Sequence, residues 1–536
     1  MKIQNLVQKK PLLLFYIILA TSFLMACSTD TDEYAEQIDT TESSETEQID
    51  DDDYDIVEND HDITEPDVID EHTLSADIDI VLIEGDDRTQ LWEEDITRFA
   101  TTIKNEFPLF RDQSSRIETS EDWLSWNLNE TFTSFPSASL IYMLDADLLQ
   151  DFDDMINDLI SRIPYLGDFE IVMGLSRALA LTGDSHTSFF FPRSYGIPLA
   201  LGSHFDEQHS ETSYPFPWPH ITGAYVGIDS VVNTRLLEIN GVEMSEIFDR
   251  MRPLFPHDNE VSLRALFSVN ALFKEILQYI GIINDEDVVP ITVRDVNGNI
   301  FTVDAPLMPA NNVPTFGERV IYRQNTDGEM THHIMDTEEF FAWEPNARNT
   351  WYRFFPEENM MYLRSSLSEE PGSIVAYQGV IETITEQGGV DIFVVDLRGN
   401  IGGSPLEGLY RFRNWARAEE NRALLGAFYV VVDTATFSMG VIEAYMFRNF
   451  LEDVILIGEP PAGGLNIFFG MNQARLQNSR VVWYRNRFGS LLDPDNEIET
   501  NTLYPDISVY RTLEDYINNH DAVIETILIR HGVTTE

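Results

Sequence analysis

The sequence predicts an α/β protein: a helical region, then a small β region, then a layered domain of strands and helices. Three patterns support this fold class. Apolar residues recur at helical spacing from about 88 to 180, and short β-branched runs fill about 196 to 310. From about 345 onward, strands alternate with helical stretches. Such alternation favours a largely parallel sheet covered by helices.

The helical region shows its period most clearly in two segments, LWEEDITRFATTIKNEF and ADLLQDFDDMINDLISRI. It ends at a polar turn, GDSHTSFFFP, which runs into aromatic residues and Pro192. We therefore expect a helical domain at 86–195.

The β region contains four runs, which are AYVGIDSV, RLLEINGV, VVPITVRDVNG and NIFTVDAPL. Asn-Gly pairs at 240–241 and 297–298 predict tight turns, the second of them in a hairpin. A helical insert, VSLRALFSVNALFKEILQYIG, separates the runs. We expect a small β domain at 196–320.

The last domain, expected at 345–536, contains the strands MMYLRSS, DIFVVDL, AFYVVVD and DVILIG. Helical stretches at 372–388, 405–418 and 438–450 separate them. In domains of this kind, reactive groups lie in loops at the carboxyl ends of the strands.

The N-terminus indicates export. Lys2, Lys9 and Lys10 precede an apolar run, LLLFYIILATSFLMA, which is typical of a signal peptide. The following Cys27 completes the tetrapeptide LMAC, which resembles the lipobox of bacterial lipoproteins. That resemblance implies a signal peptide at 1–26, a lipid on Cys27, and anchoring to the extracytoplasmic face of the bacterial cell membrane. The alternative is an uncleaved transmembrane anchor.

The segment 27–85 is expected to be an acidic, disordered tether. Between Ser28 and Ile80 there are 22 Asp or Glu and no Lys or Arg. Calcium binding is the alternative, but no Asp-x-Asp-x-Asp-Gly spacing is present. The net charge of −58 argues against nucleic acid as a partner. Cys27 is the only cysteine, which excludes an internal disulfide and a cysteine nucleophile.

Two loops in the last domain could carry chemistry. In VVDLRGNIGGSPLEG, at 394–408, a glycine-rich turn follows a strand and can present N–H groups to an anion. It lacks the lysine of a phosphate loop and the spacing of a dinucleotide fingerprint, so it is either an oxyanion site or a tight turn. In VVVDTATFSMGVIEAYMFRNF, Ser438 stands between a strand and a helix, as a helix cap or as a nucleophile.

The segments DIFVVDLRGNIGG, VVVDTATFS, VILIGEP and LYPDISV occur in an order and spacing that resemble the tail-specific, or C-terminal processing, serine peptidases and the tricorn core protease. The resemblance covers roughly 345–515, and extends more loosely upstream through GDSHTSF and RLLEINGVEM. It implies a ClpP/crotonase-like α/β peptidase core with Ser438 as nucleophile, and a PDZ-like β domain.

Two activation schemes occur among these peptidases. The Ser–Lys scheme needs a lysine where GEPPAGGL has Gly464, and no lysine follows Lys274. Resemblance to the tricorn scheme instead implies Ser185 and His186, from GDSHTSF, and a late glutamate. EIETNTLYPDI places Glu499 six residues before Pro505, with Glu497 as the alternative.

The proposed groups meet the chemical needs of a serine peptidase. A serine hydroxyl needs an adjacent base, and His186 can take its proton and return it to the leaving amine. The resemblance implies that Ser185 and Glu499 help to set the site. It also implies an oxyanion hole, which would be built from the backbone N–H groups of Met439 and of Gly402 or Gly403. A structural, hydrogen-bonded histidine is the alternative for His186.

We therefore expect a serine endopeptidase that acts on unfolded or flexible polypeptides through an acyl-enzyme. No metal or other cofactor is expected, because His332 and His333 lack His-Glu-x-x-His spacing. The oligomeric state stays open. The sequence departs from the usual motifs of these peptidases at two places. Ile401 stands where the loop usually has a glycine, and SMGVIEA stands where Ser-Ala-Ala-Glu is common after the nucleophile. These departures put the substrate preference and the catalytic activity in question. The rival interpretation is a non-catalytic surface lipoprotein that binds peptides or other ligands on the same scaffold.

Overall fold

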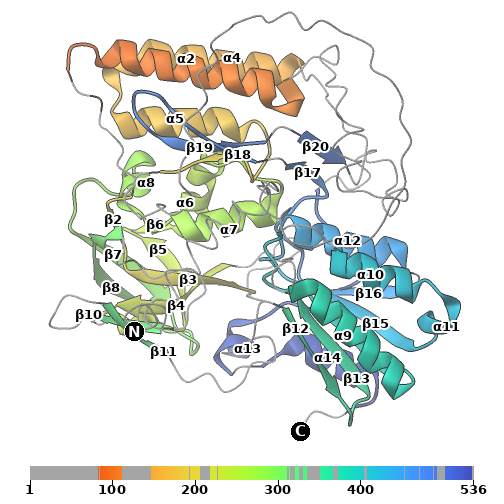
Figure 1. Cartoon of the computed structure of the whole chain (residues 1–536). Helices are drawn as coiled ribbons and strands as arrows, with labels where there is room; N and C mark the ends of the chain where they lie inside the picture. Colours follow the sequence, from red (N-terminus) through yellow and green to blue (C-terminus); the bar gives the residue numbers. More distant parts are fainter. Residues whose placement is uncertain are drawn as a thin grey trace, which may run out of the picture. The chain divides into compact units, whose positions relative to one another are not determined.

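A computed structural model gives the fold of the chain (Figure 1). The residues it describes are 83, 85–110, 146–191, 193–205, 218–225, 227–310, 313, 320–324, 330–334, 350–365, 372–403, 407–451, 453–469, 471–486, 488–491, 501–518 and 520–533. All of them belong to one compact unit. No helix in these described ranges is long and apolar enough to cross a membrane. The lipidation candidate Cys27 and the acidic candidates Glu497 and Glu499 lie outside the described residues.

The predicted helical region is confirmed, and its described residues include the helices α2 (Arg88–Glu106), α4 (Ala146–Arg162) and α5 (Asp168–Ala180). Asp168, at the start of α5, ties them together. It accepts hydrogen bonds from the guanidinium of Arg88 at 3.0 Å (Nε) and from the indole N–H of Trp92 at 2.8 Å. The apolar stripe of α2 is buried, as an amphipathic helix requires.

The β region forms a sheet with the order β11-β10-β4-β5-β7-β8, with β3 paired to β4 and β6 to β5. Its strands are β3 (Leu199–His204), β4 (Trp218–Tyr225), β5 (Thr234–Ile239), β6 (Val242–Glu243), β7 (Val288–Arg294), β8 (Ile300–Pro306), β10 (Val320–Gln324) and β11 (Met330–Ile334). Both predicted turns are present, and β7 and β8 form the expected hairpin. Asn240 and Gly241 have φ of 51° and 72°, the left-handed pair that suits an Asn-Gly hairpin turn.

Three helices accompany this sheet: α6 (Met244–Met251), α7 (Glu260–Asn270) and α8 (Lys274–Tyr279). The last two form the predicted helical insert, interrupted at 271–273. Residues of all three helices share one apolar core with β3, β5 and β7. The PDZ-like assignment of this region stays a prediction.

The last domain has a six-stranded sheet with the order β12-β13-β14-β15-β16-β21. These strands are β12 (Thr350–Phe355), β13 (Met360–Ser365), β14 (Val390–Asp396), β15 (Leu425–Val432), β16 (Val454–Gly458) and β21 (Ile507–Ser508). All neighbouring pairs are parallel except β12 with β13. The predicted α/β class with a largely parallel sheet is therefore confirmed.

Helices cover both faces of this sheet (Figure 1). The covering helices are α9 (Gly372–Gln387), α10 (Glu407–Ala416), α12 (Met439–Phe450) and α14 (Ala522–Arg530). The domain also contains the short helices α11 (Glu419–Arg422) and α13 (Leu513–Ile517). Val395 and Val430 pack in one core with α9, α10 and α12, whereas Val394 and Val431 pack in another with α14. Successive strand residues thus face opposite layers, and both faces are apolar because both are buried.

Several short strands were not predicted: β1 (Ser188–Phe189), β2 (Tyr195–Gly196), β9 (Met308–Pro309), β17 (Asn466–Phe469), β18 (Asn472–Arg475), β19 (Val482–Arg485) and β20 (Phe488–Leu491). The pairing of β1 with β19 matters for the site. It attaches the chain just after His186 to the C-terminal part of the protein.

Candidate active site

Ser438 lies between β15 and α12, at the carboxyl end of the parallel sheet. It occupies the N-cap position of α12, but its side chain makes no capping hydrogen bond. Its backbone has φ 51° and ψ −125°, a conformation that costs a non-glycine residue about 1–3 kcal/mol. Its Oγ lies 3.0 Å from Nε2 of His186. The contact favours a role as nucleophile over a role as cap.

The turn before Ser438 is fastened to the glycine-rich loop that follows β14. Phe437 donates its N–H to the carbonyl of Asn400 at 2.8 Å, and the Thr436 hydroxyl donates to the carbonyl of Leu397 at 2.9 Å. The carboxylate of Asp433 accepts the N–H of Gly399 at 2.8 Å. These bonds hold the strained conformation of Ser438 in place.

His186 stands in the turn after α5 and is buried against the ring of Phe437, with ring centroids 4.6 Å apart. Its Nδ1 lies 3.6 Å from Oδ1 of Asp184. Burial alone lowers the pKa of His186, but hydrogen bonding and charge from Asp184, with charge from Asp258, outweigh it and raise the pKa above its usual 6.5. The two carboxylates therefore favour the protonated form of His186.

Asp184 was not singled out from the sequence. It is fully buried, and it accepts the N–H of His186 at 3.0 Å, the side-chain amide of Asn486 at 2.7 Å and the hydroxyl of Thr187. Its place two residues before His186 was the available signal, since a short polar side chain there can fold back on the turn.

Ser185 contacts a different acid from the one implied by resemblance. Its Oγ accepts the N–H of Asp258 at 2.8 Å, and its own N–H donates to Oδ1 of Asp258 at 2.7 Å. Asp258 was not singled out from the sequence, because Ser185 lies 73 positions away along the chain. The glutamate implied by resemblance, Glu499 or Glu497, is outside the described residues, so its role stays a prediction.

Asp184, His186 and Asp258 also form the one group in the described part of the chain with the ligand types and spacing for a metal. One atom of each lies within 4.8 Å of the others. The four carboxylate oxygens already accept hydrogen bonds from Ser185, His186, Thr187, Gly464 and Asn486. We therefore assign the group to orienting the histidine.

Glycine at position 402 keeps space open beside the nucleophile. Gly402 has φ +106°, and a Cβ on it would lie 2.8 Å from Cβ of Ser438 and 3.0 Å from the backbone nitrogen of Met439. Its own N–H donates to Oδ1 of Asn400 at 2.9 Å. Among the three predicted oxyanion donors, Met439 and Gly403 are thus the better candidates in this conformation.

Gly464 occupies the position at which the Ser–Lys scheme has its lysine. Its N–H donates to Oδ2 of Asp258 at 3.2 Å. A Cβ there would lie 2.4 Å from Nδ2 of Asn501 and 3.2 Å from the carbonyl oxygen of Asn466, so a side chain at this position would require the Asn501 side chain to shift. The local structure agrees with the absence of lysine after Lys274.

No protein-family model and no curated protein matches the chain. Among solved structures, it is similar to mature CPAF complexed with lactacystin, with 10% identity, a TM-score of 0.48, and coverage of 80% of this chain and 96% of that one. It is also similar to the photosystem II D1 C-terminal processing protease, with 12% identity, a TM-score of 0.34, and coverage of 79% and 94%. It is similar as well to the tricorn protease, with 12% identity, a TM-score of 0.34, and coverage of 83% of this chain and 36% of that one.

These structures include both kinds of protease that the sequence resembles. Given these identities and scores, the function proposed below rests on the geometry of the site.

One more buried acid was missed by the sequence interpretation. Glu459, in the loop after β16, accepts the N–H of Arg511 at 2.9 Å, and its own N–H donates to the carbonyl of Val432 at 3.0 Å. Burial raises its pKa to about 7.

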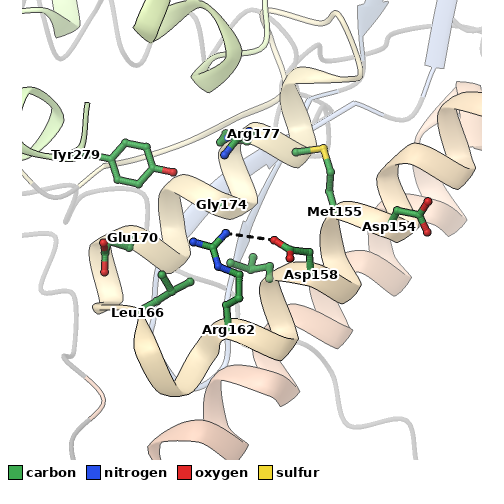
Figure 2. A pocket seen from close by; sticks show the side chains of 10 residues that line it. Asp154, Met155, Asp158, Arg162, Leu166, Glu170, Gly174, Arg177 and Tyr279 are labelled. Atoms are coloured by element: carbon green, nitrogen blue, oxygen red, sulfur yellow. Dashed lines mark hydrogen bonds and ion pairs between the residues drawn. The ribbon is translucent and has the colours of Figure 1, made fainter. Parts of the chain in front are cut away.

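A pocket of about 350 Å³ lies between α4 and α5, and Tyr279 of α8 lines it as well (Figure 2). Its polar lining includes the ion pair of Arg162 with Asp158, whose closest atoms are 3.2 Å apart on one exposed helix face. Such exposed pairs contribute little to stability or binding. None of the site residues lines this pocket.

Proposed function

We propose that the chain is a serine endopeptidase that hydrolyses peptide bonds through an acyl-enzyme on Ser438. The observation that carries the proposal is the 3.0 Å contact of Ser438 Oγ with His186 Nε2, formed by residues 252 positions apart. A base within hydrogen-bond reach of a serine hydroxyl is what nucleophilic catalysis by serine requires.

The steps follow from the placement of these groups. His186 takes the hydroxyl proton at Nε2 as Ser438 Oγ attacks the carbonyl carbon of the substrate. The N–H of Met439, beside the space that Gly402 leaves open, stabilises the oxyanion. His186 then gives the proton to the leaving amine, and water, deprotonated by the same ring, hydrolyses the acyl-enzyme.

The burial of the site supports unfolded or flexible polypeptides as substrates. Ser438 is 7% exposed and His186 is 4% exposed. A folded protein surface cannot present a peptide bond to groups this enclosed, whereas an extended segment can enter.

Degradation of casein tests the proposal. We expect the chain from Ile80 onward to cleave it, and Ser438→Ala or His186→Ala to lose about 10³-fold or more in kcat. Ser245→Ala, an exposed serine on α6, is the matched control and should keep full activity. Cleavage that survives in Ser438→Ala would refute the nucleophile. Inactivity of all forms, together with a peptide that copurifies with the protein, would favour the rival binding protein.

We also propose that the enzyme is held at the extracytoplasmic face of the bacterial membrane by a lipid on Cys27. Support comes from the lipobox-like LMAC and from the acidic segment behind it, which would act as a spacer. Metabolic labelling with a radioactive fatty acid should mark the wild type and not Cys27→Ser. Equal labelling of both proteins would contradict the anchor.

A further inference from the structure

We propose that Asp258 is a positioning residue for the peptidase reaction, which fastens the loop that carries His186 to the loop after β16, whose Gly463 and Gly464 lie beside Ser438. The inference rests on the proposed function. Asp258 belongs to neither of these loops; it comes from the β region, just before α7.

The contacts of Asp258 with the histidine loop are reciprocal. Its N–H donates to Oγ of Ser185 at 2.8 Å, and its Oδ1 accepts the N–H of Ser185 at 2.7 Å. Because Ser185 directly precedes His186, this two-bond contact fixes the backbone from which the imidazole extends. One of the carboxylate oxygens of Asp258 also lies within 4.8 Å of a ring nitrogen of His186.

The other carboxylate oxygen reaches the peptidase core. Oδ2 of Asp258 accepts the N–H of Gly464 at 3.2 Å. The neighbouring Gly463 packs against the nucleophile, since a Cβ on it would lie 2.9 Å from the backbone nitrogen of Ser438. One carboxylate thus joins the segment of the base to the loop that packs against Ser438, each through a backbone N–H.

The residues after Asp258 extend the same connection. Asn259 donates its side-chain amide to the carbonyls of Gly463 at 3.4 Å and Asn501 at 3.3 Å. Val261 packs with Phe437 and Ala462 in a small buried cluster. Phe437 directly precedes Ser438, and its ring lies against the ring of His186. Apolar contacts therefore reinforce the hydrogen bonds that hold His186 close to Ser438.

Asp258 would affect catalysis because the reaction needs Nε2 of His186 within hydrogen-bond distance of Oγ of Ser438. Displacement of a base by about 1 Å can cost about 10²-fold in rate. The negative charge of Asp258 also acts on the imidazole, since it is one of the charges that raise the pKa of His186, along with that of Asp184. Loss of the carboxylate should therefore alter both the position and the titration of the base.

The test is the pH profile of peptide cleavage by Asp258→Asn, which keeps the side-chain shape and removes the charge. We expect kcat to fall about 10- to 100-fold with little change in KM. The neutral imidazole is the active base, so kcat/KM rises with pH through the pKa of His186. Without the Asp258 charge this rise should move to lower pH. Asp304→Asn, an exposed acid on β8, is the matched control and should leave kcat and the profile unchanged.

Ser185→Ala serves as a second variant in case Asp258→Asn does not fold. It removes the acceptor for the Asp258 N–H and keeps the carboxylate with its bond to the Ser185 N–H. We expect a smaller fall in kcat at unchanged KM, and less than additive effects when both changes are combined. An active wild type whose kcat and pH profile are unaffected by both changes would overturn the role of Asp258 alone. An inactive wild type would instead overturn the proposed function.

Discussion

At the scale of single residues, the site depends on two left-handed positions that face each other. Ser438 has φ 51° and Gly402 has φ +106°. The first aims a hydroxyl at His186, and the second keeps a side chain out of the space where an oxyanion would form. A strained backbone conformation persists only where surrounding contacts hold it in place. The hydrogen bonds of Phe437 and Thr436 to the loop after β14 do so here.

Gly402→Ala tests this arrangement. The added Cβ would meet Cβ of Ser438 at 2.8 Å and the nitrogen of Met439 at 3.0 Å, so the loop must shift. We expect kcat to fall by about 10²-fold, comparable to the loss of one oxyanion donor, while circular dichroism stays that of the wild type. Gly227→Ala, at an open surface turn with φ +110°, is the control for backbone strain. An unchanged kcat in Gly402→Ala would contradict the assigned oxyanion space.

Motifs in the sequence pointed to Ser438, His186 and Gly402 because each lies within a short local pattern. Asp258 has no such pattern. Its partners lie 73 positions away at Ser185 and 206 positions away at Gly464, so only the folded chain brings them together.

At the scale of elements, a buried ionic network holds the glycine-rich loop at the end of β14. Asp396 accepts hydrogen bonds from Arg398, from Arg364 at 2.9 Å and from the hydroxyl of Tyr362 at 2.6 Å. Arg398 also reaches Asp521 at the start of α14, with contacts of 2.9 and 2.8 Å. The network joins the loop to a helix on the other layer. Burial opposes the charge of Asp396, but the two arginines outweigh it and hold its pKa well below the usual range.

Arg398→Met should be strongly destabilising. It leaves the buried carboxylate of Asp396 and the partly buried one of Asp521 without their shared partner, and removing one partner of a buried ion pair typically costs about 3–5 kcal/mol. Urea unfolding measures the change in the free energy of unfolding. Arg398→Lys keeps the charge but not the paired hydrogen bonds, so its free energy of unfolding should lie between those of the wild type and Arg398→Met. A change in unfolding free energy below about 1 kcal/mol for Arg398→Met would contradict the role of the network.

The elements that could be predicted are those with a clear period. The apolar faces of α2 and α4 and the β-branched runs of β14 and β15 were visible in the sequence. β18 reads NQAR, which is polar and mostly exposed, and both it and β19, which reads VWYR, are too short to show a period. Their pairing with each other and with β1 is decided by tertiary contacts.

At the scale of the whole molecule, the described residues form one unit in which the first helices contact the last domain. Asp95 of α2 accepts the N–H and the hydroxyl of Ser479, each at 2.8 Å. Glu459 and Arg511 lie at another such junction. Arg511 donates its N–H to Glu459, and its carbonyl accepts the N–H of Phe205, which follows β3. The catalytic pair therefore depends on the folding of the whole unit.

Glu459 predicts how stability depends on pH. Its pKa is raised from 4.5 to about 7 in the folded chain. Between these two pH values the folded chain holds a proton on Glu459 that the unfolded chain has lost. Its contribution to the free energy of unfolding is complete below about pH 4.5 and declines as pH rises through 7, by up to about 3 kcal/mol. Urea unfolding at pH 5 and pH 8 should show a smaller decline in Glu459→Gln than in the wild type. Equal declines would show that Glu459 does not hold the proton.

The central claim is that Ser438 is a nucleophile activated by His186. The most direct measurement is covalent labelling by a fluorophosphonate, located by mass spectrometry of the digested protein. We predict labelling of the wild type at Ser438, slowed at least about 10²-fold in His186→Ala and absent in Ser438→Ala. Labelling that does not depend on His186, or that lies on another residue, would contradict the account.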